Sequence, residues 1–88
     1  MHLKAYTTVK CFYCDQLKEL LKRIDPETKD IKVDLIQVGK DVSKEFFTYE
    51  HPDAIGFPYV EIDGKHIGGL VETAQILLRK GFVSRNKK

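Results

Sequence analysis

Cys11 and Cys14 are the only cysteines in the chain, and two residues separate them. They follow a short strand-like run and open an amphipathic segment, so they lie where a helix is predicted to begin. The first N–H groups of a helix have no partner within it, and negative charge is stabilised there. We therefore expect the Cys11 thiol to have a lowered pKa, with Lys10 beside it adding to the effect. Because Cys14 lies one turn later on the same face, the spacing predicts a dithiol–disulfide exchange site.

Two other interpretations of the cysteine pair are half of a zinc site and a pair of inert buried thiols. Structural zinc normally takes four protein ligands. Apart from the two cysteines, the only good candidates are His2, His51 and His66, and the chain has no second cysteine pair. Thiol–disulfide exchange needs no histidine because the thiolate itself attacks the disulfide. We predict redox chemistry without a metal site, and His66 is expected to be a partly exposed strand residue.

The size and charge of the chain narrow the class of protein. Eighty-eight residues allow one domain, residues 1–88, with a single modest core and a flexible basic tail from about residue 83. A formal charge of +2 is too small to indicate nucleic-acid binding. No apolar run approaches the roughly 18 residues that span a bilayer, and the first residues lack the apolar core of a signal peptide. We expect a cytoplasmic monomer, in a compartment where structural disulfides are rare.

Hydrophobic periodicity predicts a strand–helix–strand unit in the first half. Residues 3–7 alternate as a short strand does, and apolar positions then recur at helical spacing over residues 13–24. Pro26 is expected to end this helix. Residues 31–38 are rich in β-branched side chains and predict a second strand, covered on both faces near its end. The unit implies parallel pairing with a right-handed crossover.

A second helix is predicted from a cap at Asp41 or Ser43 to about His51, where Pro52 closes it. Its aromatic residues are expected to pack in or near the core: Phe46, Phe47 and Tyr49. This packing role is favoured over a cofactor-binding one, because aromatic side chains at helical spacing are usually core residues.

A β-hairpin and a last helix are predicted for the second half. Residues 59–62 and 65–67 flank an Asp-Gly pair, which favours the tightest hairpin turns. The Gly-Gly pair at 68–69 then precedes a helix with one apolar face. The element order β-α-β-α-β-β-α accounts for the whole chain.

Residues 56–69, with the sequence Gly-Phe-Pro-Tyr-Val-Glu-Ile-Asp-Gly-Lys-His-Ile-Gly-Gly, resemble the glutaredoxin pattern when taken together with the CxYC pair. The resemblance covers nearly the whole chain and implies a thioredoxin-like α/β fold, a four-stranded mixed sheet flanked by three helices. It implies that Cys11 is the nucleophile, Cys14 the resolving thiol and Pro58 a cis-proline facing them. The implied glutathione-binding residues are Tyr13, Phe57, Pro58, Gly69, Leu70 and Val71.

The family resemblance implies a glutathione-dependent thiol–disulfide oxidoreductase that reduces protein disulfides and glutathione mixed disulfides. Glutathione would be a co-substrate, with no tightly bound cofactor, and the partners would be disulfide-bearing proteins such as ribonucleotide reductase. Two alternatives stay open: a thioredoxin-like reductase supplied by a reductase enzyme, and an iron–sulfur cluster carrier.

Three positions depart from the family pattern. Phe12 stands where the family usually has proline, and Thr8 stands where a lysine often precedes the nucleophile by three residues. Val71 replaces a polar residue near the start of the last helix, with Glu72 one position later. The backbone N–H groups of that helix start are independent of side chain and could still bind a carboxylate of glutathione.

Overall fold

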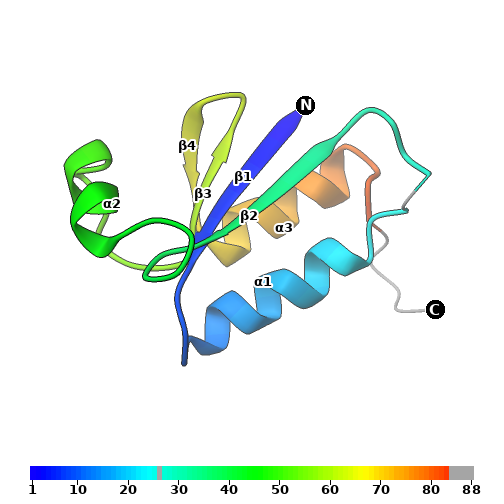
Figure 1. The fold of residues 1–88 in the computed structure, drawn as a ribbon. Helices are drawn as coiled ribbons and strands as arrows, with labels where there is room; N and C mark the ends of the chain where they lie inside the picture. Colours follow the sequence, from blue (N-terminus) through cyan, green and yellow to red (C-terminus); the bar gives the residue numbers. More distant parts are fainter. Residues whose placement is uncertain (26, 84–88) are drawn as a thin grey trace.

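The computed structural model describes residues 1–25 and 27–83, so Pro26 and the basic residues 84–88 lie outside the described residues. Seven elements follow one another in the predicted order (Figure 1). They are β1 (His2–Thr7), α1 (Phe12–Lys22), β2 (Lys32–Gln37), α2 (Lys44–Glu50), β3 (Tyr59–Ile62), β4 (Lys65–Gly68) and α3 (Leu70–Arg79). The predicted fold class is therefore confirmed.

The four strands form one mixed sheet in the order β2-β1-β3-β4. β1 pairs parallel with β2 and antiparallel with β3, and β3 pairs antiparallel with β4. The predicted hairpin turn is present, and both of its residues adopt positive φ, 53° at Asp63 and 83° at Gly64. An Asp-Gly pair suits this turn because it tolerates the left-handed backbone at both positions.

β2 is an edge strand, so the prediction of a strand central enough to be covered on both faces near its end is wrong about its position; its side chains are at most partly covered, and Val38 just after its end is buried. Its only strand neighbour among the described residues is β1, and the Leu35 side chain is 46% exposed. β-Branched and apolar residues favour a strand wherever it lies. Whether that strand is central depends on which other strands pair with it, and local sequence does not contain that information.

The main core lies between one face of the sheet and the two helices α1 and α3, which Figure 1 shows running together across that face. Its fully buried members include Leu3, Leu17, Val60 and Leu77. Val83 belongs to the same core and is 7% exposed, whereas the rest of the tail predicted from about residue 83 lies outside the described residues. Burying this apolar side chain keeps the chain folded past the end of α3.

α2 covers the other face of the sheet at one end and forms a smaller core with Val38, Phe47 and Tyr59. The Ser43 side chain caps α2 by accepting a hydrogen bond from the Phe46 N–H at 3.0 Å. Of the two caps predicted for this helix, Ser43 is therefore the one confirmed. Asp41 instead accepts from the backbone of β2, where its carboxylate binds the Gln37 N–H at 2.9 Å.

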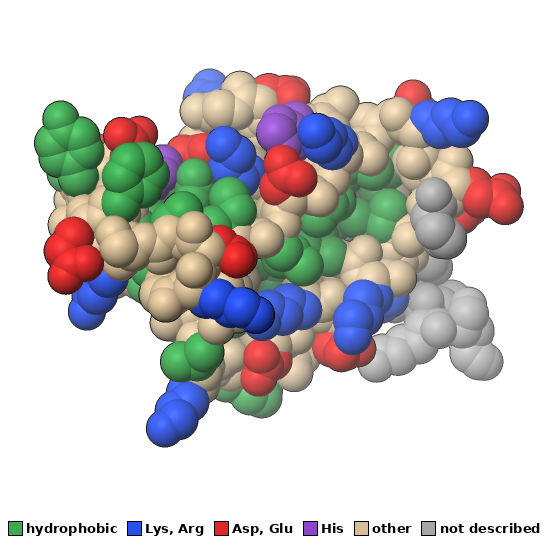
Figure 2. Space-filling model, in the orientation of Figure 1, with side chains coloured by type: hydrophobic (Ala, Val, Ile, Leu, Met, Phe, Trp, Pro, Cys, Tyr) green, Lys and Arg blue, Asp and Glu red, His purple; other side chains and the backbone are tan. Residues whose placement is uncertain are grey.

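Two aromatic residues of α2 are exposed, which contradicts the prediction that they pack in or near the core. Phe46 is 53% exposed and Tyr49 80%, and Figure 2 shows hydrophobic side chains at the surface over this helix. A helix that meets the sheet along one stripe buries only the side chains on that stripe. Phe47 occupies that stripe and is 4% exposed.

No helix in residues 1–25 and 27–83 has the length and apolar character needed to cross a membrane.

Candidate active site

Cys11 caps the N-terminus of α1 and is joined to Cys14 by a disulfide, with the two Cα atoms 5.1 Å apart. The Cys11 residue itself is extended, and its Sγ accepts a hydrogen bond from the Cys14 N–H at 3.1 Å. The preceding residue, Lys10, has a left-handed backbone with φ of 56°. The helix start that the sequence predicted is present, and the Cys11 sulfur lies at its positive end.

The two sulfur-bearing residues differ in exposure. Cys14 is fully buried against the core side of α1, whereas Cys11 is partly exposed at the surface. A thiolate from outside the protein can therefore reach Cys11 and not Cys14. Lys10, the residue before this accessible cysteine, is exposed.

The backbone of Phe57 lies beside the Cys11 sulfur, and Pro58 follows it in the chain. Their peptide bond is cis, as the family resemblance implied, and Pro58 is buried. The carbonyl oxygen of Phe57 lies 3.9 Å from the Cys11 Sγ, although 46 residues separate the two in sequence. The Phe57 ring packs on Phe47 of α2 with centroids 5.1 Å apart.

A hollow of about 330 Å³ begins at this cis peptide and extends to the start of α3. Three of the six predicted glutathione-binding residues line it, namely Phe57, Pro58 and Gly69. The other six lining residues were not among the predicted binding residues: Ile55, Gly56, Tyr59, His66, Gly68 and Glu72. Gly69 lies so close to Pro58 that a Cβ on it would be 3.3 Å from the Pro58 carbonyl oxygen.

Glu72 places a carboxylate at the start of α3. Its Oε1 accepts a hydrogen bond from the Gly69 N–H at 3.0 Å, and its side chain lies over Gly68. A Cβ on Gly68, which has φ of 131°, would be 2.7 Å from the Glu72 side chain. The hydrogen bond from Gly69, followed by that from its own backbone, lowers the pKa of Glu72 below its usual value. The helix start that could receive a ligand carboxylate thus already holds one from the chain itself.

The remaining predicted ligand-binding residues lie elsewhere. Leu70 and Val71 line a separate hollow between α1 and α3, and Val71 is 61% exposed. Tyr13 is 60% exposed and packs edge-to-face on Phe12, with ring centroids 5.6 Å apart. The hollow beside Pro58 does not include these three residues.

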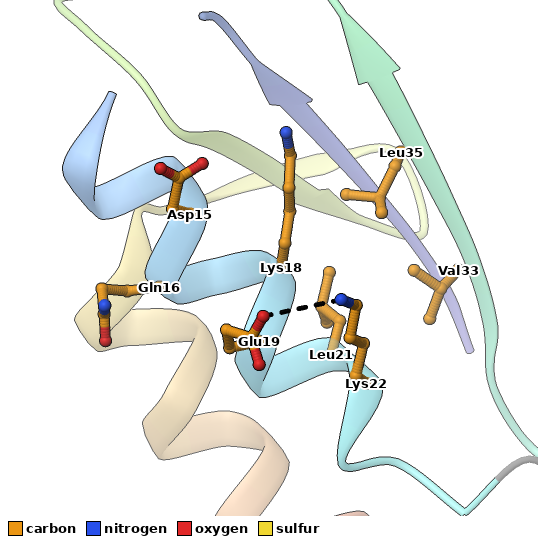
Figure 3. Close-up of a pocket in the computed structure, with 8 residues that line it drawn as sticks. All are labelled: Asp15, Gln16, Lys18, Glu19, Leu21, Lys22, Val33 and Leu35. Carbon is orange, nitrogen blue, oxygen red and sulfur yellow. Dashed lines mark ion pairs between the residues drawn. The ribbon is translucent and has the colours of Figure 1, made fainter. Parts of the chain in front are cut away.

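A further hollow of about 530 Å³ lies between α1 and the edge strand β2 (Figure 3). Leu21, Val33 and Leu35 form its apolar floor, and charged side chains of α1 form its rim. Lys22 and Glu19 make an ion pair of 3.5 Å within that rim. This hollow shares no lining residue with the hollow at the Phe57–Pro58 peptide.

Residues 1–25 and 27–83 contain no group of three or more His, Cys, Asp or Glu side chains placed to hold a metal ion.

The four-stranded mixed sheet and its three helices form a thioredoxin-like fold. Three solved structures of Escherichia coli glutaredoxin share the fold of this chain. The oxidised form, determined by NMR, has a TM-score of 0.66 at 21% identity, over 89% of this chain and 94% of that one. The reduced form has a TM-score of 0.60 at 20% identity, over 90% of this chain and 95% of that one. A further structure has a TM-score of 0.60 at 19% identity, over 91% of this chain and 96% of that one.

The chain therefore has the glutaredoxin fold. Neither a protein-family model nor a curated protein sequence matches it.

Proposed function

We propose that this protein is a glutathione-dependent thiol–disulfide oxidoreductase. The observation that carries the proposal is the Cys11–Cys14 disulfide at the start of α1, with one sulfur exposed and facing the Phe57 carbonyl. A disulfide between cysteines only three positions apart constrains the unfolded chain very little. A role in stabilising the fold therefore explains this disulfide poorly. Its location at a helix start, with one accessible sulfur, favours exchange.

In the forward reaction the reduced Cys11 thiolate attacks a sulfur of a partner's disulfide. A mixed disulfide forms, and the other partner sulfur leaves as a thiolate and takes up a proton. The Cys14 thiol then loses its proton and attacks the Cys11 Sγ, which releases the second partner sulfur. Two electrons pass to the partner, and the Cys11–Cys14 disulfide is the oxidised product.

The start of α1 stabilises the thiolate form of Cys11. The Cys14 N–H, which donates to the Cys11 Sγ at 3.1 Å, is one of the amides that have no acceptor within the helix. Its donation and the helix dipole both favour a negative sulfur, as does the nearby charge of Lys10. A more stable Cys11 thiolate is also a better leaving group when Cys14 attacks.

Two glutathione molecules would restore the dithiol. The first thiolate attacks Cys11 and displaces Cys14, and the second attacks the resulting mixed disulfide and leaves as oxidised glutathione. The hollow at Phe57, Pro58 and Gly69 is the candidate binding site for the glutathione attached to Cys11, since Phe57 lines it and has its carbonyl oxygen 3.9 Å from the Cys11 Sγ. Disulfide-bearing proteins are the proposed partners, and the cytoplasm is the proposed compartment.

The test is a coupled assay with a small glutathione mixed disulfide, glutathione, glutathione reductase and NADPH. Cys11→Ser should abolish turnover, whereas Cys14→Ser should retain it, because free glutathione can resolve the mixed disulfide on Cys11. An active Cys11→Ser alongside an inactive Cys14→Ser would reverse the assigned roles.

A second candidate is a protein-disulfide reductase supplied by a reductase enzyme in place of glutathione. The Glu72 carboxylate favours it, because it occupies the helix start that a glutathione carboxylate would otherwise use. No turnover with glutathione, together with reduction by thioredoxin reductase, would establish this second candidate and refute the first.

A further inference from the structure

The loop between α2 and β3, residues 51–58, carries Phe57 and Pro58 to the disulfide. His51 is the first residue of this loop and is held at three points. Its N–H donates to the Phe47 carbonyl at 2.8 Å, and its carbonyl accepts from the Ala54 N–H at 3.0 Å. Its ring Nδ1 lies 3.4 Å from Oε2 of Glu61 on β3. One residue therefore joins α2, the loop and the sheet.

The contact between His51 and Glu61 is shielded from water. The two side chains are 13% and 14% exposed, whereas the other His–carboxylate pair, His2 with Asp34, is 42% and 40% exposed. When one partner of a shielded pair is removed, the other is left as a buried polar or charged group without a partner. The resulting loss of stability is larger than for a pair at the surface. Cross-strand neighbours Lys4 and His66 also flank Glu61 in the sheet register.

Aromatic rings surround the His51 imidazole. Its centroid lies 4.9 Å from Tyr6, 4.9 Å from Phe47 and 4.8 Å from Tyr59. Burial, and after it the charge of Glu61, raises the pKa of both Tyr6 and Tyr59, so the carboxylate acts on the same cluster. Phe47 continues the contacts to the ring of Phe57 at 5.1 Å. Packed side chains thus connect the His51–Glu61 pair to the residue beside the disulfide.

We propose that His51 is a positioning residue for the reaction, which fixes the loop 51–58 through Glu61 so that Phe57 stays against Cys11. The inference rests on the proposed function, because it concerns the loop that would bind the partner of Cys11. His51 itself does not touch the disulfide. Its effect should appear in how well a partner is held and not in the rate of sulfur exchange.

The experiment compares His51→Phe, which keeps a ring among the aromatic residues, with the double variant His51→Phe/Glu61→Gln, which leaves no unpaired buried charge. The matched control is His2→Phe, which removes a histidine paired with a carboxylate far along the same sheet face. The glutathione-coupled assay separates kcat from KM, and hydrogen–deuterium exchange measures the Ala54 amide, which bonds to the His51 carbonyl.

Both His51 variants should raise KM for the glutathione mixed disulfide by roughly three- to tenfold, with kcat changed less than twofold. The Ala54 amide should exchange faster in both, while the Ala5 amide in β1 stays as in the wild type. His2→Phe should change neither readout. Wild-type KM and Ala54 exchange in the double variant would overturn the proposal, as would equal changes in His2→Phe. If the wild type does not turn over with glutathione, the proposed function fails, and Ala54 exchange still decides this inference.

Discussion

Replacing Glu72 by glutamine should strengthen glutathione binding. The new amide side chain would keep an oxygen that accepts from the Gly69 N–H, so the helix start keeps its cap while it loses its negative charge. In the wild type a glutathione carboxylate approaching the same amides meets the Glu72 carboxylate. Two unit charges on the order of 5 Å apart at a solvent-exposed site change an affinity by about fourfold. Among the described residues, no Lys or Arg lines this hollow to offset that repulsion.

The assay is KM for a glutathione mixed disulfide, which should fall about fourfold in Glu72→Gln at low salt and less at high salt. Glu19→Gln is the control, since it removes an equal charge from the exposed rim of α1, away from the cysteines. Reduction of the Cys11–Cys14 disulfide by uncharged dithiothreitol should be the same in all three proteins. A higher KM in Glu72→Gln would refute the reasoning and show that the carboxylate binds the ligand directly.

Three predictions concern stability and use urea unfolding. Thr73→Val should lower the free energy of unfolding by roughly 1–3 kcal/mol, because the fully buried Thr73 hydroxyl donates to the Gly69 carbonyl at 2.7 Å and valine lacks this donor. The control is Thr48→Val at an exposed position, and an equal loss of stability in both variants would contradict the prediction. Leu77→Ala should cost about 2–5 kcal/mol by opening a cavity in the main core, where Leu77 is fully buried; a loss below about 1 kcal/mol would show that the core closes around it. The pKa of Glu72 is lowered in the folded state. Its carboxylate therefore contributes fully to folding stability at a pH above its ordinary pKa of 4.5, and this contribution is lost as the pH falls through its pKa in the folded protein. The stability difference between the wild type and Glu72→Gln should accordingly be constant at neutral pH and shrink on acidification, and a difference that grows on acidification would contradict the assigned cause.

The sequence was sufficient for the elements whose chemistry is local. Helical and strand periodicities, the cap at Ser43 and the Asp-Gly turn each depend on a few consecutive residues, and all are present in the structure. The order of elements followed from them, whereas the fold class followed from the resemblance of the CxYC pair and residues 56–69 to the glutaredoxin pattern. The helix start at Cys11 was predictable for the same reason, because its cause is the junction of a strand and a helix.

The features that the sequence failed to predict depend on contacts between distant segments. The edge position of β2 follows from strand pairing, and the exposure of Phe46 and Tyr49 follows from where α2 meets the sheet. His51 and Glu61 meet only because the loop 51–58 brings α2 back to β3. Glu72 is different, since a Glu three residues after a helix cap commonly binds the cap's N–H. That local pattern was available at Gly69, although glycine is a less usual cap than serine or threonine.

The site therefore combines two kinds of determinant that can vary independently. The difference between an accessible Cys11 and a buried Cys14 arises from their spacing at a helix start, where the cap lies outside the helix and the third residue faces the core. A chain that keeps this spacing and the same helix face keeps one accessible and one buried cysteine, and with them the proposed order of attack. In the proposed function, the choice of partner depends instead on Phe57, Gly69 and Glu72, which lie in other parts of the chain and line one hollow. Substitutions at Glu72 should thus change the choice of reductant while leaving the exchange chemistry of the cysteine pair intact.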